Sequence, residues 1–286
     1  MAAARVAAAM GSLHAAAPGE PFTWAGGIFQ QMYRNALGQP PNLYELHPEQ
    51  FGTALLEQAR ATWCERVVSE FRSIQIMTRF LGELVSSGEP VDVYAGALDL
   101  VKDEVRHTEL CAAVCERLGA TPRLPNPVEL RETAAFNASP PRDRALVSAI
   151  SMLCINETLS VSFIEDLATR CTNPGLRAVL HDIIGDEEEH QEFGWSYVRR
   201  ALLRQSDERL RALRGLVRVT LAPHEQSAAR ALSGIPDAQQ RLALLPEPDL
   251  AALGLFSPVR QALVYRRCVQ EVLLPKLAAM DLTPRP

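Results

Sequence analysis

The sequence predicts an all-α fold: a four-helix bundle with additional helices before and after it. Almost every stretch longer than about ten residues repeats its apolar side chains at helical spacing, and none alternates as a half-buried strand does. Two copies of Glu-x-x-His, Glu104–His107 and Glu187–His190, fall on two of the long predicted helices. Residues three apart share a helix face, so each pair can bind one metal ion from the same side.

Composition describes an ordinary globular chain. Its 286 residues are 47% hydrophobic and 22% charged, which is typical of a water-soluble protein. The net charge of −5 and the lack of a long basic cluster argue against a nucleic-acid partner. No run of about 18 apolar residues occurs, so we expect no membrane span.

The six cysteines include no Cys-x-x-Cys pair, which excludes a rubredoxin-type iron site and a thioredoxin-like motif. Cys111 and Cys115 are four residues apart and share a helix face, as expected of reduced cysteines packed like small apolar residues. Reduced thiols predict a cytoplasmic protein.

The expected elements follow one another along the chain. Residues 1–20 are predicted to form a flexible alanine-rich tail, and residues 21–286 a single helical domain. Its metal-binding core covers about 48–204, and residues 205–286 supply accessory C-terminal helices. The expected helices run from Pro21 to about Leu37, Pro48 to about Val85, Asp92 to Leu118, Pro141 to Cys171, and onward to about Arg204, followed by Asp207–Leu232, bent at Pro223, and Pro258–Met280, kinked or capped at Pro275.

The connections predict how the four core helices are joined. Gly88 and Pro90 mark a short break after the first helix, and Pro174 and Gly175 mark another after the third. The proline-spaced segment 119–141 is long enough to cross the bundle from end to end. Two tight turns and one long crossing match the topology of ferritin-like bundles.

Depth along antiparallel helices selects the remaining ligands. Glu70 lies 18 residues before Gly88 and Glu104 lies 16 after it, so both reach a similar depth; Glu157, 17 residues before Pro174, matches the other motif in the same way. The rivals lie at the wrong depth or point away: Glu65, Glu165, His181, Glu188 and Glu189. The predicted metal ligands are Glu70, Glu104, His107, Glu157, Glu187 and His190.

An aspartate precedes each motif, and metal-bound histidines usually donate their other ring N–H to a carboxylate. We therefore expect Asp103 to orient His190 and Asp186 to orient His107. Two alternatives remain, in which each aspartate pairs with Arg106 or is merely solvated.

Mixed carboxylate and imidazole ligands suit two iron ions, with manganese as the main competitor. Two Fe(II) ions about 3.5–4 Å apart can jointly deliver electrons to O2, the expected co-substrate. Glu104 and Glu157 are the expected bridging carboxylates.

Apolar residues in helical phase with the ligands predict a pocket for a partly hydrophobic organic substrate, with plain core packing as the alternative. They are Ile74, Met77, Cys111, Leu153, Val161, Ile183 and Phe193.

From about Thr62 to Arg200 the chain resembles the bacterial diiron carboxylate proteins of the ferritin-like superfamily. Residues 103–108 are very similar to the Asp-Glu-x-Arg-His motif of soluble methane and toluene monooxygenase hydroxylases. Acyl-carrier-protein desaturases and p-aminobenzoate N-oxygenase carry related forms. The chain departs from two of these families: Ile183 replaces an additional histidine ligand of the N-oxygenase, and Val161 replaces a threonine of the hydroxylases.

The resemblance implies an O2-dependent oxidase or oxygenase that hydroxylates, N-oxygenates or desaturates a small organic molecule. No ferredoxin or flavin motif is visible, so we expect electrons from a separate donor protein, such as a ferredoxin or its reductase. The alternatives are a ferritin- or rubrerythrin-like protein that handles iron or scavenges peroxide, and a non-catalytic interaction protein with structural metals. Apolar helices outside the core are compatible with a homodimer.

Overall fold

The computed structural model describes residues 19–125, 130 and 132–284, and the chain is helical over most of this length. The all-α class is therefore confirmed. Most of the predicted tail and part of the predicted crossing segment lie outside the described residues. The main elements are β1 (Glu20–Pro21), α2 (Gly27–Leu37), α3 (Thr53–Ser87), α4 (Val91–Arg117), β2 (Arg123–Leu124), α5 (Ala134–Asn137), α6 (Pro141–Ser148), a π-helix (Ala149–Asn156), α7 (Glu157–Arg170), α8 (Pro174–Leu202), α9 (Asp207–Leu232), α10 (Pro248–Ala252), α11 (Pro258–Cys268), a second π-helix (Val269–Leu273) and α12 (Leu274–Ala278).

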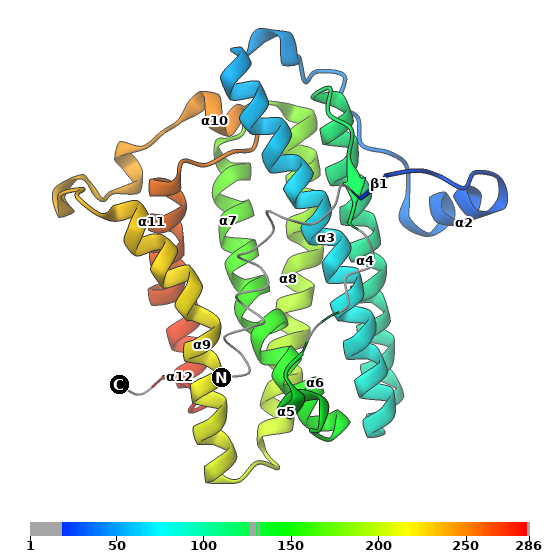
Figure 1. Ribbon diagram of the computed structural model, residues 1–286, viewed down its shortest axis with the longest axis vertical. Helices are drawn as coiled ribbons and strands as arrows, with labels where there is room; N and C mark the ends of the chain where they lie inside the picture. The colour runs from blue at the N-terminus through cyan, green and yellow to red at the C-terminus, as the bar shows by residue number, and fades with distance from the viewer. Residues whose placement is uncertain (1–18, 126–129, 131, 285–286) are drawn as a thin grey trace.

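Four long helical rods lie side by side in the middle of the molecule: α3, α4, the continuous rod 141–170, and α8 (Figure 1). α3 packs against α4, α7 packs against α8, and α4 meets α8 between the two pairs. Gly88 caps α3 in the left-handed conformation at φ 69°, which glycine adopts without steric cost. Asn173 caps α8 by accepting a hydrogen bond from the Leu176 N–H at 2.9 Å.

Several helices begin at residues other than those predicted. The first helix begins at Gly27 rather than Pro21, because Gly26 and Gly27 both have positive φ. Pro48 starts a single 3-10 turn, and α3 follows at Thr53. A two-residue antiparallel pairing joins β1 to β2, which the sequence did not indicate.

The rod 141–170 is not a uniform α-helix, because residues 149–156 form a π-helix. A π turn holds an extra residue and rotates everything after it about the helix axis, so it sets the direction in which Glu157 projects. Gly194 on α8 packs against this segment, where an added Cβ would lie 2.3 Å from the Cβ of Leu153. Glycine is thus required for α8 to come this close.

The C-terminal helices cover one side of the rods. α11 packs against both α7 and α9, and α9 also meets the π-helix (Figure 1). By length and composition the helix Pro141–Arg170 alone, among the described helices, resembles a membrane span, but 67% of its most apolar window is buried inside the protein. Packing against α8, α9 and α11 therefore accounts for its hydropathy.

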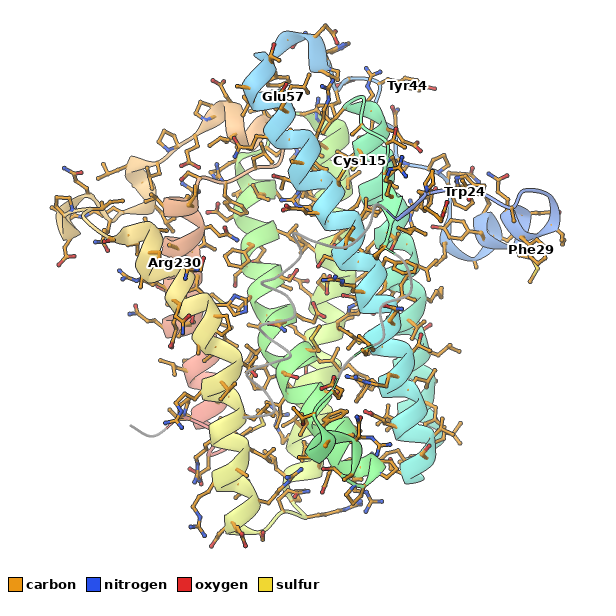
Figure 2. All side chains as sticks on the ribbon, viewed as in Figure 1. Trp24, Phe29, Tyr44, Glu57, Cys115 and Arg230 are labelled. Atoms are coloured by element: carbon orange, nitrogen blue, oxygen red, sulfur yellow. The ribbon has the colours of Figure 1, made fainter. Side chains whose placement is uncertain are left out.

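α2 projects from the side of the rods, and none of its residues is buried (Figures 1 and 2). Phe29 points outward and is 69% exposed. Tyr33 and Arg34 attach the helix to α4, because both contact the carboxylate of Glu109.

Buried apolar side chains form two clusters. The Trp195 cluster includes Phe80, Leu153 and much of α9 and α11, and the Trp63 cluster includes Leu110, Ile183 and Leu253. Leu100 on α4 belongs to the first cluster and Leu110 to the second. The motif Glu104–His107 therefore lies where the two clusters meet.

Candidate metal centre

The six predicted ligand residues, hereafter the Glu/His cluster, converge from four helical rods. α4 supplies Glu104 and His107, α8 supplies Glu187 and His190, α3 supplies Glu70, and α7 begins with Glu157. Their side chains fall into two groups in which one donor atom from each residue lies within 4.8 Å of the others: Glu104, Glu157, Glu187 and His190 in one, and Glu70, Glu104 and His107 in the other. Glu104 belongs to both groups, so the two groups, each of which could hold a metal ion, are adjacent and share a carboxylate.

Two carboxylates lie between the histidines, whose ring centroids are 5.9 Å apart. Glu104 places Oε1 3.7 Å from Nδ1 of His190 and Oε2 3.8 Å from Nδ1 of His107. Glu187 places Oε2 3.1 Å from Nδ1 of His190 and Oε1 3.7 Å from Nδ1 of His107. Glu104 and Glu187 are therefore the carboxylates placed to bridge, whereas the sequence favoured Glu104 and Glu157.

The remaining two glutamates lie one at each end of the cluster. Glu70 Oε2 is 3.9 Å from Nδ1 of His107. Glu157 belongs to the group of Glu104, Glu187 and His190, and it does not belong to the group that contains His107. Each histidine thus has one glutamate of its own besides the two that it shares.

Both histidines turn their outer ring nitrogen to an aspartate. Asp186 Oδ2 lies 3.1 Å from Nε2 of His107, and Asp103 Oδ2 lies 3.4 Å from Nε2 of His190. This is the crosswise pairing that the sequence predicted. A proton held on Nε2 by the aspartate leaves the Nδ1 lone pair directed at the carboxylates.

Arg106 does not pair with either aspartate, so that alternative is wrong. It donates to Glu109 and to the carbonyl oxygen of Gln39, the latter at 2.8 Å. Two residues along a helix correspond to about 200° of rotation, so Arg106 projects away from the face that carries Glu104.

Burial, neighbouring carboxylates and the two histidines together set the pKa values of the cluster. Burial and neighbouring carboxylates raise the pKa of Glu70 to about 8, and they raise the pKa of Glu104 and Glu157 above the usual range. Burial alone disfavours a charged imidazole, yet Asp103 and Glu187 outweigh it and raise the pKa of His190 to about 10. Within the described part of the chain, no lysine or arginine forms an ion pair with any of the four glutamates.

Two atoms of the cluster that could bind a metal ion have no hydrogen-bond partner. Oε2 of Glu104 and Nδ1 of His107 are buried and make no hydrogen bond. Leaving such groups unpaired in a protein interior costs free energy, so each requires an explanation. A divalent cation between them accounts for both atoms, and oxygen with imidazole nitrogen is a donor set that binds iron and manganese. The residues present therefore fit a bound metal ion.

The residues that the depth argument rejected are all at the surface. The exposed set is Glu65, Glu165, His181, Glu188 and Glu189. Depth and rotation along the helices therefore separate the buried carboxylates from exposed neighbours of the same chemistry.

The seven predicted pocket residues divide between the two apolar clusters. Met77 and Leu153 belong to the Trp195 cluster, with Phe193 packed against it, and Cys111 and Ile183 belong to the Trp63 cluster. Val161 is buried and Ile74 is half-buried. A cavity of about 70 Å³ between α7, α9 and α11 is lined by none of the seven. The substrate pocket stays a prediction.

A polar chain beside Glu157 was not predicted. The Thr158 hydroxyl accepts a hydrogen bond from Nε1 of Trp195 at 3.1 Å and lies 3.2 Å from Oε1 of Gln191. The Lys276 ammonium reaches the same Gln191 oxygen at 3.3 Å. Thr158 and Gln191 directly follow the predicted ligands Glu157 and His190 in the sequence, and this adjacency is the signal that could have identified them. Nothing in the local pattern indicates Lys276.

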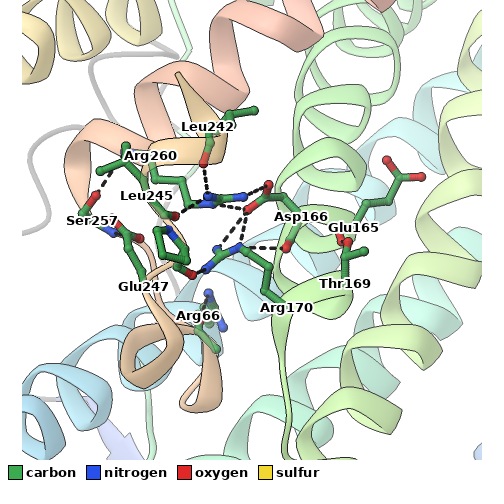
Figure 3. Close-up of polar contacts among 12 residues, drawn as sticks. Arg66, Glu165, Asp166, Thr169, Arg170, Leu242, Leu245, Glu247, Ser257 and Arg260 are labelled. Carbon is green, nitrogen blue, oxygen red and sulfur yellow. Dashed lines mark hydrogen bonds and ion pairs between the residues drawn. The ribbon is translucent and has the colours of Figure 1, made fainter. Parts of the chain in front are cut away.

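A second buried polar group, the Asp166 cluster, was also missed (Figure 3). Asp166 accepts hydrogen bonds from Arg260 at 2.8 and 2.7 Å and from Arg170 at 3.1 and 2.9 Å. Arg260 also donates to the carbonyl oxygens of Leu242 and Leu245. The group therefore fixes the segment before α10 and the start of α11 to α7.

No family model, curated protein or solved structure matches the chain. The function of the chain is therefore inferred from the site itself. What it establishes is a buried group of glutamates and histidines whose donor atoms are close enough to hold a metal ion.

Proposed function

We propose that this chain is a ferritin-like dinuclear iron protein that uses O2 to oxidise a partly hydrophobic organic molecule. The observation that carries the proposal is the pair of ligand groups sharing Glu104. The order of the rods supports it, because α3 pairs with α4, α7 pairs with α8, and a short turn closes each pair. This arrangement and ligand set are those of dinuclear carboxylate sites in helical bundles.

Charge supports two divalent ions rather than one. Metal binding requires deprotonated ligands, so in the loaded site the four glutamates carry four negative charges and the two neutral imidazoles add none. Two divalent cations neutralise this set, which removes the cost of burying several like charges together. A single divalent ion would leave two negative charges without compensation in a site where Glu104, Glu157 and Glu187 are at most 5% exposed.

When bound, two iron ions supply the electrons that reduce O2. The protein side chains keep the site in a state that accepts such ions. Asp186 and Asp103 accept a hydrogen bond from Nε2 of His107 and His190, respectively. Nδ1 of each ring is then the nitrogen that can bind the metal. The apolar clusters on either side exclude water, which strengthens the electrostatic interactions inside.

Turnover requires partners that the chain does not contain. Repeated reduction requires a separate electron donor, a ferredoxin or its reductase in this proposal. The substrate is an organic molecule with apolar surface, because the side chains around the Glu/His cluster are mainly apolar.

Anaerobic loading with Fe(II), followed by O2, tests the proposal. We expect two iron ions per chain and O2 uptake that continues only while a reductant is supplied. Glu104→Ala should abolish both, because Glu104 serves both groups. Glu188→Ala is the matched control, because Glu188 is an exposed glutamate next to Glu187 and should change neither.

The other outcomes select the alternatives. Uptake of many iron ions per chain as a mineral indicates iron storage. Two tightly held ions that never react with O2 indicate a structural metal centre. Failure of the native chain to bind iron or manganese overturns the proposal.

A further inference from the structure

Two thiols outside the Glu/His cluster lie in contact between α3 and α4. Sγ of Cys115 is 3.6 Å from Sγ of Cys64. Cys115 is buried towards the upper end of α4, whereas Cys64 is half-buried (Figure 2). Among the described residues no other pair of cysteines forms such a contact.

The two thiols differ in access. Cys64 retains solvent exposure, so a small oxidant can reach it, whereas Cys111, Cys115, Cys154, Cys171 and Cys268 are all buried. Burial and the neighbouring Cys64 raise the pKa of Cys115, so its thiol stays protonated. Oxidation of a thiol requires access by the oxidant, which makes the half-buried Cys64 the first target.

The helix pair allows a covalent bond. Packed helices lie about 8–10 Å apart with Cα atoms about 2.3 Å from each axis, so facing residues reach the Cα spacing of about 4.4–6.8 Å that disulfides need. A disulfide bond is about 2.05 Å long, so the sulfurs must approach by about 1.5 Å, a distance that side-chain rotation covers.

We propose that Cys64 and Cys115 form a peroxide-oxidised dithiol that closes into a reversible disulfide between α3 and α4. The Cys64 thiol gives up its proton and its sulfur attacks hydrogen peroxide; the O–O bond breaks, Cys64 becomes a sulfenic acid, and the leaving hydroxide takes up that proton to form water. The Cys115 sulfur then attacks the Cys64 sulfur, an S–S bond forms, and water leaves with the Cys115 proton. Overall, two thiols are oxidised to one disulfide and one peroxide is reduced to two waters.

The bond would join the two helices that carry Glu70, Glu104 and His107. Cys64 lies on the same helix as Glu70, and Cys115 lies on the same helix as His107. The modification does not depend on the proposed function, because its chemistry requires only the thiols and the peroxide.

Thiol counting on the full metal-free chain tests the modification. The chain is treated with hydrogen peroxide and quenched, and its free thiols are counted after denaturation. We expect the count to fall from six to four, a monomeric mass lower by about 2 Da, and a peptide that links Cys64 to Cys115. A dithiol reductant should restore all six thiols.

Variants decide whether this pair is responsible. Cys64→Ser should abolish the disulfide, and Cys115→Ser should leave a sulfenic acid on Cys64 that a dimedone probe captures. Cys111→Ser is the matched control and should still form the link; circular dichroism melts establish that each variant is folded. Six thiols that survive treatment of the native chain, or a disulfide that forms without Cys64, overturn the proposal.

Discussion

Glu157 and Asp166 lie on the same helix, α7, and are 5% and 6% exposed, yet their surroundings are opposite. Asp166 is held by Arg260 and Arg170, which outweigh the effect of burial and lower its pKa. Glu157 faces Glu187 and Glu104, and burial with these neighbours raises its pKa well above the usual range.

The difference shows how this protein treats buried charge. A buried carboxylate is stable when a cation accompanies it, and at Asp166 the chain supplies that cation itself. At the Glu/His cluster the chain gathers four carboxylates and, among the described residues, supplies no arginine or lysine in an ion pair with them. The Asp166 cluster is thus neutralised by arginines of the chain, whereas the Glu/His cluster could hold a metal ion among its carboxylates.

Breaking the Asp166 cluster should have the largest effect on folding. Asp166→Asn leaves Arg260 buried without its counter-charge, so we expect the free energy of unfolding to fall by about 3 kcal/mol. Denaturant unfolding of the metal-free chain measures this change. Glu165→Gln, at the exposed neighbouring position, should have little effect. If Asp166→Asn left the free energy of unfolding unchanged, the guanidinium groups would not stabilise the C-terminal segment.

The equivalent change at Glu157 should act in the opposite direction. Burial and neighbouring carboxylates raise the pKa of Glu157, which costs stability at neutral pH. Glu157→Gln removes that cost, so the metal-free chain should become more stable. It also removes a ligand, so iron affinity should fall by more than about a hundredfold, since changes beyond the ligands already cost about 10- to 100-fold. Parallel melts and metal titrations measure both. Lower stability of the metal-free variant would contradict the comparison.

Substituting one aspartate should have a smaller effect. Asp186→Asn weakens the hydrogen bond that orients His107, and we expect a loss of about 10- to 100-fold in metal affinity. Melting of the metal-free chain should change little, because Asp186 is partly exposed. Asp182→Asn, at an exposed position on the same helix, is the control. Unchanged metal affinity in Asp186→Asn would remove its assigned role.

The two regions should also respond oppositely to pH. The pKa of Glu70 rises from 4.5 to about 8 on folding, so its contribution to stability is present below pH 4.5 and disappears as the pH rises to about 8. The pKa of Asp166 falls on folding, so its contribution is present above its ordinary value of 3.8 and is lost in acid. One titrating group changes stability by at most about 1.4 kcal/mol per pH unit.

Melting curves of the metal-free chain between pH 5 and pH 8 check this response. Stability should fall as the pH rises, and bound iron or manganese should reverse the trend, because metal binding requires deprotonated ligands. A metal-free stability that rises towards pH 8 would contradict the assigned environments.

Helical periodicity and ligand spacing predicted the parts of the structure that depend on local repetition. Glu70 and Glu157 lie at the level of the two Glu-x-x-His motifs, as their distances from the turns predicted, and Asp186 lies beside His107, as predicted. These inferences succeed because an α-helix has a fixed rise and rotation per residue.

The remaining features depend on contacts that local patterns do not contain. The π-helix before Glu157 is a change in hydrogen-bond register, and the apolar sequence around it is equally compatible with an α-helix. Arg260 meets Asp166 across 94 residues, so only the folded chain brings them together. Glu187, rather than Glu157, is the second carboxylate that lies close to both histidines, which is again a contact that only the folded chain reveals.

Anomalous diffraction from crystals of the iron-loaded protein tests the central claim most directly. We predict two iron peaks about 3.5–4 Å apart, with Glu104 and Glu187 each within bonding distance of both. A single peak, or iron bound away from these two carboxylates, would contradict the account.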